Sequence, residues 1–314
     1  VLDGLVHAAE VSVDGRQEAR LDGGIGPVRL PVDPWLDGAL HTWQLDVTGA
    51  APDLELVAGT WANRARLSSP PRLDLGGGPL DDLWASLQED GVQLSVLASS
   101  GASVRFLAAL DGAVLQELGR APVVDGRAAL QGVPWTGPRW PDGPADLVFI
   151  WAVLEDDKGQ ELDRLGLRTG LRQLSLDPDA LVLNGRPVHL VAMRHWTHPL
   201  DETLDQVVHH GANTLELHGL APDPAWLDRA DELGLFVVDL PRCDGQVRAS
   251  PDRIARWLDV LNAQTAARVS AMRGHPSLLM WSMEGAVSDQ MPLLHGFSND
   301  PLDRIVAGVD LPSE

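Results

Sequence analysis

Residues 224–239 read PAWLDRADELGLFVVD, and this stretch decides the fold class. Apolar residues spaced three and four apart over 224–233 predict an amphipathic helix, which Gly234 ends as a glycine C-cap. The apolar run that follows, 235–239, has the length of a buried strand. A helix joined to a buried strand through one glycine indicates a βα repeat with parallel strands.

The same alternation extends to both sides of this stretch. It predicts further strands at 188–192, 213–217, 278–281 and 305–309, and further helices at 204–210 and 251–272. Residues 175–314 therefore hold about five βα units, whereas a complete (β/α) barrel has eight units and about 250 residues. We expect a partial barrel of the TIM type, whose open edge near 305–309 is covered by further chain or by a protein partner.

Residues 1–174 have the pattern of β structure instead. Apolar and polar residues alternate along short runs such as AEVSV at 9–13, which the turn pair Asp14–Gly15 ends. Similar runs recur at 43–47, 92–97, 104–110 and 147–154. The composition shifts at SSPP, residues 68–71, which indicates a linker. The spacing of the runs predicts one or two β-sandwich modules before the βα units.

The chain is strongly acidic, with 45 Asp and Glu residues against 24 Lys and Arg residues and a net charge of −21. Such a chain is repelled by the phosphate backbone and by anionic lipids, so we expect no nucleic-acid partner and no binding to a membrane surface. No apolar run approaches the roughly 20 residues of a membrane span, so we expect no membrane insertion by this segment. The single cysteine, Cys243, excludes an intrachain disulfide and a cysteine-rich metal site.

Neither a cofactor nor a metal ion is predicted. The sequence contains no GxxxxGK[ST] or GxGxxG phosphate-binding loop. Several histidines gather in the βα region, namely His195, His198, His209, His210 and His218. They lack the H-E-x-x-H spacing that places two ligands on one face of a helix, so the pattern does not indicate a metal site.

Three stretches together resemble glycoside hydrolase family 2, the group of β-galactosidases, β-glucuronidases and β-mannosidases. AEVSVDG at 9–15, followed by GGIGP at 23–27, is similar to the second half of the family's N-terminal jelly roll. A second stretch, which ends at GLR, 166–168, resembles the immunoglobulin-like middle domain. A third opens with LNGRPV at 183–188 and reaches GHPSLLMWS at 274–282, similar to the family's barrel signature NHPSIIMWSLGNE.

The resemblance implies a multidomain β plus α/β protein. It implies a partial jelly-roll β-sandwich with sugar-binding character at 1–68, an immunoglobulin-like β-sandwich at 69–174 and a partial (β/α) barrel at 175–314. The family has further strands before Val1 and after Glu314, so we expect a fragment of a longer chain or a truncated relative. The sequence does not fix the location of the protein, and the resemblance favours the cell envelope or the extracellular space.

The resemblance also indicates where catalysis is expected. Retaining glycosidases need two carboxyl groups about 5–5.5 Å apart, one as acid/base and one as nucleophile. The family's acid/base is the glutamate that ends WSLGNE, but here the segment reads WSMEGA at 281–286. Ala286 takes the acid/base position without gaps, and Glu284 takes it only with a two-residue deletion; otherwise Glu284 is a solvated loop carboxylate. The family's nucleophile lies well downstream, and no residue is assigned to it.

Four further residues are candidates for sugar binding: His195, His218, Asp239 and Trp281. The family often has a substrate-side histidine after its first strand, where His195 stands. Asp239 keeps the first acid of the Asp-Glu pair that often ends the third strand. The Trp281 indole suits the floor of a sugar pocket, since aromatic faces pack on sugar rings, and suits a buried core equally well. Glu216 replaces an arginine of the family, and His275 is expected to form structural hydrogen bonds.

These departures predict a catalytically inactive relative of glycoside hydrolase family 2, a pseudoenzyme that binds carbohydrate or serves as a scaffold module of a larger chain or assembly. The alternative is an active retaining β-glycosidase whose nucleophile lies beyond the chain end. A third interpretation is an unrelated β-sandwich and α/β protein. The Asp-Glu-Leu-Gly and His-Pro-Ser motifs, which follow one another in the family's order, oppose this third interpretation.

Overall fold

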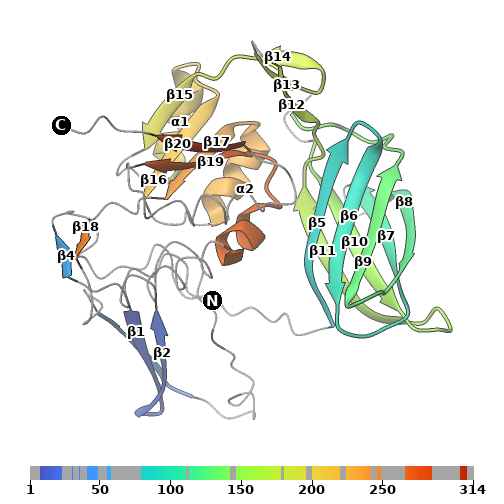
Figure 1. Cartoon of the computed structure of the whole chain (residues 1–314), viewed down its shortest axis with the longest axis horizontal. Coiled ribbons are helices and arrows are strands. Elements are labelled where there is room, and N and C mark those ends of the chain that lie inside the picture. The colour runs from blue at the N-terminus through green and yellow to red at the C-terminus, as the bar shows by residue number, and fades with distance from the viewer. Residues whose placement is uncertain are drawn as a thin grey trace.

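The computed structural model describes residues 8–22, 30, 35, 41–48, 55–57, 79–110, 113–141, 146–177, 180–195, 200–219, 224–241, 246–248, 266–284 and 305–309. Within them the fold is mostly β, and the α-helices lie between residues 200 and 272, after the middle β strands. Figure 1 shows a module of long antiparallel strands at the right, a helix-covered sheet at the upper left and a further hairpin at the lower left. None of the described helices is long and apolar enough to cross a membrane.

An antiparallel sheet of three strands comes first, in the order β2-β1-β3. The strands are β1 (Ala8–Val13), β2 (Arg16–Asp22) and β3 (Trp43–Thr48). Asp14 and Gly15, both with positive φ (51° and 80°), form the two-residue turn between β1 and β2. This backbone is typical of hairpin turns whose twist matches that of the strands, and it confirms the predicted strand and turn.

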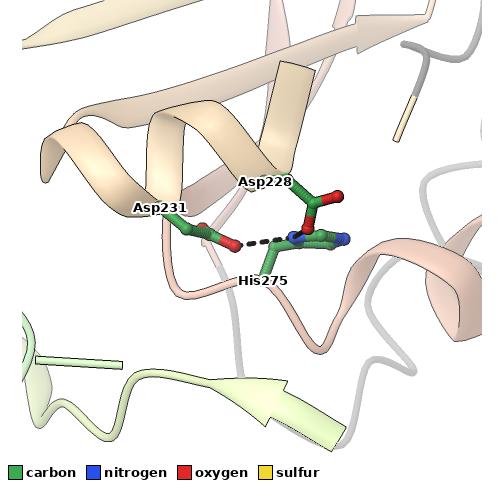
Figure 2. Close-up of side chains that lie close together, drawn as sticks. All are labelled: Asp228, Asp231 and His275. Carbon is green, nitrogen blue, oxygen red and sulfur yellow. Dashed lines mark hydrogen bonds and ion pairs between the residues drawn. The ribbon is translucent and has the colours of Figure 1, made fainter. Parts of the chain in front are cut away.

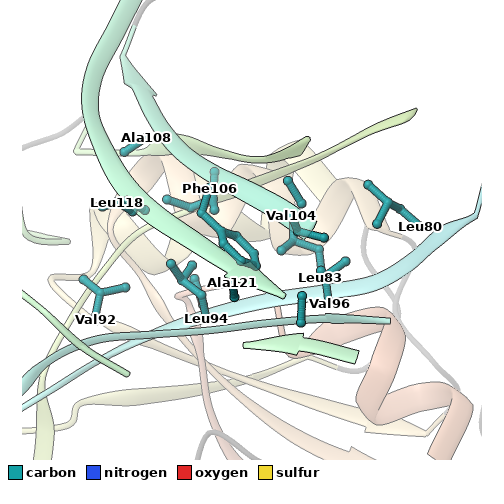
Figure 3. Close-up of a cluster of buried hydrophobic side chains, with 14 of the residues drawn as sticks. Leu80, Leu83, Val92, Leu94, Val96, Val104, Phe106, Ala108, Leu118 and Ala121 are labelled. Atoms are coloured by element: carbon teal, nitrogen blue, oxygen red, sulfur yellow. The ribbon is translucent and has the colours of Figure 1, made fainter. Parts of the chain in front are cut away.

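Strands β5 to β11 form two antiparallel sheets, here called the middle β module, around one apolar core. The strands are β5 (Leu80–Gln88), β6 (Gly91–Ala98), β7 (Ser103–Leu110), β8 (Ala113–Pro122), β9 (Arg127–Val133), β10 (Val148–Glu155) and β11 (Glu161–Thr169). One sheet has the order β5-β6-β9 and the other β11-β10-β7-β8. Alternate residues point inward and are buried, as the two-residue period of the sequence predicts. Figure 3 shows side chains of both sheets meeting around Phe106, which is fully buried.

A short antiparallel sheet connects the middle β module to the last part of the chain. Its strands are β12 (Leu174–Asp177), β13 (Ala180–Leu183) and β14 (Arg186–Val188). The strand predicted at 188–192 is divided, because β14 ends at Val188 and the next strand begins at Ala192. The side chain of Asn213 accounts for the break: it bonds to the backbone of His189 and Val191, at 2.7 and 2.8 Å, and so replaces their strand pairing.

The last part of the chain is a parallel sheet with the order β15-β16-β17-β19-β20, here called the parallel-sheet module together with its helices. The strands are β15 (Ala192–His195), β16 (Thr214–Gly219), β17 (Phe236–Pro241), β19 (Leu278–Glu284) and β20 (Ile305–Val309), and the helices are α1 (Leu200–His209), α2 (Pro224–Leu233) and residues 266–272. Every pair of neighbouring strands is parallel, as the βα pattern predicts. Gly234 ends α2 with φ of 67°, which confirms the predicted glycine cap.

Two apolar clusters cover the two faces of this parallel sheet. On the helix side, Leu215, Val237 and Trp281 pack against α1, α2 and residues 266–272. On the other face, Phe236 and Leu279 pack against Trp140 and the β12-β13-β14 sheet. Both Phe236 and Leu279 lie near the amino ends of their strands. The β12-β13-β14 sheet therefore covers the amino ends of the parallel strands on this face, and not their carboxyl ends.

A further pair of short strands joins distant parts of the chain. Strand β4 (Glu55–Val57) pairs antiparallel with β18 (Gln246–Arg248), in the segment after β17. Because β4 precedes the middle β module in the sequence, this pairing joins the N-terminal region to the segment that follows β17. This pairing was not predicted from the sequence.

Polar contacts also tie the middle β module to the parallel-sheet module. The Trp140 indole N–H donates to the Asp231 carbonyl at 2.9 Å, and Arg172 donates to the Leu278 carbonyl at 2.6 Å. Arg168 forms an ion pair with Glu232 of α2 at 3.1 Å. Hydrogen bonds from Arg229 and then from Arg168 hold the pKa of the Glu232 carboxyl below its ordinary value.

Candidate functional site

The carboxyl ends of β15, β16, β17 and β19 meet at one edge of the parallel sheet. The register pairs His195 with Leu217, Leu217 with Asp239, and Asp239 with Trp281, so these residues form one row across the sheet. His218 lies one residue beyond this row, and Glu284 lies three residues beyond Trp281, opposite Val309 of β20. All five predicted site residues therefore occupy the edge where ligands bind in parallel α/β sheets.

The two faces of the sheet differ at this edge. Leu215 and Leu217 of β16 are buried against the helices, and Glu216 between them lies on the opposite face because side chains alternate along a strand. Glu216 is paired in register with Arg194 of β15, and Arg194 Nε lies 3.1 Å from Glu216 Oε2. These side chains are 45% (Arg194) and 27% (Glu216) exposed, so the pair is accessible to solvent.

Asp239 is held inside the helix-side core by Arg268. Arg268 Nε donates to Asp239 Oδ2 at 2.7 Å, and Arg268 Nη2 donates to Asp239 Oδ1, so the pair is bidentate. Both side chains are completely buried. A bidentate arginine satisfies both carboxylate oxygens, and burial of the pair removes it from solvent. In this structure the buried Asp239 side chain joins the carboxyl-terminal half of β17 to the helical residues 266–272 through Arg268.

Trp281 is also completely buried, in the same helix-side cluster as Leu215 and Val237. Its ring has no solvent-exposed surface on which a sugar ring could pack. Of the two roles weighed for this indole, the structure places it in the core. It lies one position from Met280, which is only partly buried and packs on the opposite face of the sheet.

The other three predicted site residues are placed by their backbones alone. His195 is the last residue of β15, His218 is the last but one of β16, and Glu284 is the last residue of β19. Their side chains lie outside the described part of the structure. Ala286, which aligns with the family's acid/base, lies outside the described residues, as do residues 251–265 of the helix predicted at 251–272.

A second cluster of polar side chains lies at the opposite, amino end of β19. Figure 2 shows His275 beside Asp228 and Asp231 of α2. His275 Nδ1 lies 2.7 Å from Asp231 Oδ2, and the Ser277 backbone N–H donates to Asp231 Oδ1 at 2.9 Å. We call Asp231, His275 and Ser277 the Asp231 clasp. It joins α2 to the segment before β19, which is the structural role expected of His275.

The clasp and Asp228 also have the composition of a metal site. One ligand atom from each of Asp228, Asp231 and His275 lies within 4.8 Å of the others. However, both Asp231 oxygens already accept hydrogen bonds, and His275 Nδ1 is bonded to one of them. Asp228 Oδ1 is 4.0 Å from His275 Nδ1. Three of the atoms that could bind an ion are therefore already engaged in hydrogen bonds within the clasp.

Sequence reasoning missed Arg268, the residue that holds Asp239. The signal available for it was its position: Arg268 lies four residues before Met272 and next to Val269, on the apolar side of the predicted helix. An arginine at a core position of an amphipathic helix requires a buried acid. The sequence does not show which acid that is, because Asp239 lies 29 residues away.

Comparisons with known proteins show what the chain is similar to. No family model matches the chain. A β-galactosidase of Enterobacter cloacae is 24% identical over 185 residues, which cover 54% of this chain and 17% of the relative. Solved structures match nearly the whole chain. The β-glucuronidase of Bifidobacterium dentium, complexed with coumarin-3-O-glucuronide, has a TM-score of 0.73 at 16% identity, with 100% of this chain and 62% of that chain covered.

Another solved structure bears the family name itself. The GH2 β-galacturonidase of Eisenbergiella tayi, bound to glycerol, has a TM-score of 0.68 at 18% identity and covers 99% of this chain and 60% of its own. The chain is thus similar to proteins of glycoside hydrolase family 2. The chain spans about 60% of the length of these two solved structures, and its match covers less than a fifth of the curated β-galactosidase. The structural likeness extends to the mostly β architecture with few helices.

Proposed function

We propose that this family 2 relative binds carbohydrate at the carboxyl ends of β15 to β19 and does not hydrolyse it. The observation that carries the proposal is that Glu216 and Asp239, the two carboxylates described on β16 and β17, are each held by an arginine. Retaining hydrolysis needs two carboxyl groups free to act on the sugar, about 5–5.5 Å apart. Carboxylates engaged in ion pairs with Arg194 and Arg268 support the strands instead.

The sequence at the end of β19 supports the same conclusion. Ala286 stands where the family has its acid/base, and an alanine has no proton to donate. General acid–base catalysis typically contributes 10²–10⁴-fold to a rate, so this replacement alone is expected to reduce hydrolysis strongly. Sugar binding does not require that carboxyl group, and the names of the relatives indicate galactosides and uronic acid derivatives as classes of ligand.

The proposed architecture follows the resemblance: a partial jelly roll at 1–68, an immunoglobulin-like β-sandwich at 69–174 and a partial (β/α) barrel at 175–314. Support comes from the hairpin of the N-terminal sheet, the two sheets of the middle β module and the five parallel strands that follow. In a partial barrel β20 has an open edge, and we propose that further chain or a protein partner covers it.

The site residues take different parts in this proposal. His195 and His218, at the ends of β15 and β16, are proposed to contact the sugar, and Glu284 is proposed as the displaced acid/base candidate at the end of β19. Asp239 and Trp281 are proposed to support this edge from the core, since both are completely buried. The candidate site requires no cofactor.

The test is an assay of aryl β-galactosides, β-glucuronides and β-mannosides with the purified chain, alongside a measurement of oligosaccharide binding. The proposal predicts binding without turnover. The Glu284→Gln variant removes the displaced acid without changing its shape, and Glu161→Gln, in the middle β module, is the matched control. Absence of both binding and turnover would leave only a scaffold role.

The alternative is an active retaining β-glycosidase. The position of Glu284 favours it, because this carboxylate ends β19 on the carboxyl side of the sheet, where barrel enzymes place catalytic residues. In that case the chain, or a longer protein that contains it, hydrolyses an aryl glycoside, and Glu284→Gln abolishes the turnover while Glu161→Gln does not. That result would replace the proposal by the alternative.

A further inference from the structure

We propose that the outer face of β10 is a second carbohydrate-binding surface, which holds a chain of neutral sugars on the rings of Phe149 and Trp151. We call these two residues the aromatic pair. They belong to the middle β module, so the inference goes beyond the function proposed for the carboxyl ends of the parallel strands. It is independent of that function, because no residue is common to the two surfaces.

The aromatic pair is presented on the outside of the middle β module. Val148, Ile150 and Ala152 of the same strand are buried in the core. Because side chains alternate along a strand, Phe149 and Trp151 point to the opposite face. Their rings are nearly parallel, with 15° between the ring planes and 6.0 Å between the centroids, and Phe149 is 38% exposed. Aromatic faces pack on sugar rings, so two parallel rings on one strand suit successive sugars of a chain.

Gly166 of β11 makes room for the Trp151 indole. It is paired in register with Trp151, and a Cβ atom at Gly166 would lie only 2.6 Å from Trp151 Cζ3. The indole therefore packs directly on the backbone of β11. The Arg164 guanidinium lies 5.9 Å from the centroid of the indole, near the outer limit of a cation–π contact. These contacts hold the indole in one orientation, so a sugar that binds on it costs little side-chain entropy.

Two ion pairs flank the aromatic pair along β11. Arg164 donates two hydrogen bonds to Glu161, at 3.1 and 2.9 Å, and Arg168, opposite Phe149 in the register, pairs with Glu232 at 3.1 Å. The four side chains are between 36% and 49% exposed. A sugar hydroxyl both donates and accepts hydrogen bonds, whereas a guanidinium only donates and a carboxylate only accepts. The ion pairs therefore offer both kinds of partner to hydroxyl groups at the edge of a sugar ring.

The charge of this surface favours neutral sugars. The Arg164–Glu161 and Arg168–Glu232 pairs each combine one positive and one negative group, whereas the whole chain has a net charge of −21. An anionic glycan would be repelled by the chain, and it would compete with a carboxylate for each guanidinium. A neutral sugar chain meets neither obstacle.

The exposed apolar area is too small for a stable protein interface. Leu107 and Ala109, which pair with Trp151 and Phe149 in the register, are already buried and add little to the surface. The aromatic pair is itself more than half covered, which leaves less than about 250 Å² of exposed ring surface. A stable protein interface buries about 800 Å² per partner, more than half of it apolar. The surface therefore suits a narrow sugar chain better than a second protein.

The experiment follows the Trp151 indole N–H signal by NMR while neutral β-1,4-linked hexasaccharides are added to the purified chain. Cellohexaose, mannohexaose and galactohexaose are the neutral probes, and the β-1,4-linked hexaglucuronate is the anionic comparison. The signal is assigned by its loss in Trp151→Ala. Because it is local to the aromatic pair, it separates this surface from the carboxyl ends of β15 to β19. Calorimetry measures the affinity of each sugar.

Two further variants change the surface without removing Trp151. Phe149→Ala deletes one ring, and Gly166→Ala keeps both rings but places a methyl group where the indole lies. Val124→Ala is the control, because Val124 is a 59% exposed apolar residue in the turn between β8 and β9, outside the aromatic pair. Circular dichroism of each variant shows whether a lost signal reflects unfolding.

We expect at least one neutral hexasaccharide to shift the Trp151 signal, and the hexaglucuronate to bind at least about tenfold more weakly. Phe149→Ala should weaken binding of the neutral chain about tenfold, since one ring contact is lost. Gly166→Ala should weaken it about as much by displacing the indole. Val124→Ala should leave the affinity unchanged.

Three results would overturn the inference. The first is that no neutral hexasaccharide shifts the Trp151 signal; a hexasaccharide that still binds then belongs to the carboxyl-end site, so the proposed function survives. The second is that Phe149→Ala and Gly166→Ala weaken binding no more than Val124→Ala does. The third is a Trp151 signal that moves with protein concentration and not with sugar, which would assign this face to a second copy of the chain.

Discussion

The middle β module and the parallel-sheet module bury charge in different ways. In the middle β module the core is apolar, and its buried Glu155 lies at the rim, bound by Arg105 at 3.0 Å and Arg120 at 2.8 Å, whose side chains reach solvent. In the parallel-sheet module, Arg268 and Asp239 are completely buried within the apolar cluster. Solvent thus screens the charges around Glu155 and not those of the Asp239–Arg268 pair.

This difference shows what each module depends on. Apolar packing is non-directional and tolerates changes that conserve volume. A buried ion pair contributes little net stability compared with an apolar pair of the same size, but the loss of one partner leaves a charge without compensation. The parallel-sheet module should therefore be sensitive to single polar changes that the middle β module would tolerate. The Asp231 clasp adds to this sensitivity, because its buried carboxylate binds two groups.

The largest effect is expected from Asp239→Leu. The change leaves the Arg268 guanidinium buried without its acid, which should lower the free energy of unfolding of the parallel-sheet module by about 3–5 kcal/mol. Hydrogen exchange of the β16, β17 and β19 amides measures this loss separately from the middle β module. The double variant Asp239→Leu with Arg268→Met should recover most of the stability. A loss under about 1 kcal/mol in the single variant would contradict the importance of the pair.

The next effect concerns the apolar core of the middle β module. Leu94→Ala should destabilise that module by about 2–5 kcal/mol, because Leu94 is 1% exposed and its removal leaves a cavity. Urea unfolding together with hydrogen exchange of β6 and β7 measures the loss. Leu162→Ala is the control, since Leu162 on β11 is 50% exposed and should cost less than about 0.5 kcal/mol. Equal losses in the two variants would mean that the described core does not hold the module together.

A smaller effect is expected in the Asp231 clasp. Asp231→Asn removes the charge that binds His275 and the Ser277 amide, and should cost about 1–3 kcal/mol at neutral pH. Thermal or urea unfolding measures it, with Asp228→Asn as the control on the same helix. Asp228 is largely exposed and 4.0 Å from His275, so its replacement should change stability by less than about 0.5 kcal/mol. A larger loss of stability in Asp228→Asn than in Asp231→Asn would mean that Asp228, and not Asp231, is the carboxylate that holds His275.

The smallest effect is at the contact between the two modules. Arg229 and Arg168 lower the pKa of Glu232, so this carboxylate stabilises the fold at pH values above its unfolded pKa of about 4.3. The contribution is lost as the pH falls through the lower, folded pKa. Because the pair is exposed, Glu232→Gln should cost only about 0.5 kcal/mol at pH 7, and less in high salt. The urea midpoints of the wild type and of Glu232→Gln should converge by about pH 3. A difference between them that grows toward low pH would contradict a stabilising role of the ionised Glu232 carboxylate.

The sequence predicted the local parts of this fold and not the contacts between distant residues. Strand 9–13 with its Asp14–Gly15 turn, and helix 224–233 with its Gly234 cap, depend on neighbouring residues, and the structure confirms both. The division of the strand predicted at 188–192 depends on the side chain of Asn213, more than 20 residues away. The spacing of apolar and polar residues along the sequence does not reveal a contact between residues so far apart.

The candidate site shows the same limit. Strand order placed His195, His218, Asp239, Trp281 and Glu284 at one edge of the sheet. Which face each side chain occupies depends on the register, and a shift of one residue exchanges the faces. Residue type alone therefore did not separate Glu216, which is partly exposed, from Asp239, which is buried with Arg268. That separation needs the three-dimensional structure.

The central claim is that sugar binds at the carboxyl ends of the parallel strands without being cleaved. The most direct measurement is a crystal structure of the chain soaked with methyl β-D-galactopyranoside at a concentration above its measured dissociation constant. The account predicts an intact glycoside at the ends of β15 to β19, in contact with His195 and His218. A sugar bound only elsewhere, such as on the β2-β1-β3 sheet, or a cleaved glycoside at this edge, would contradict it.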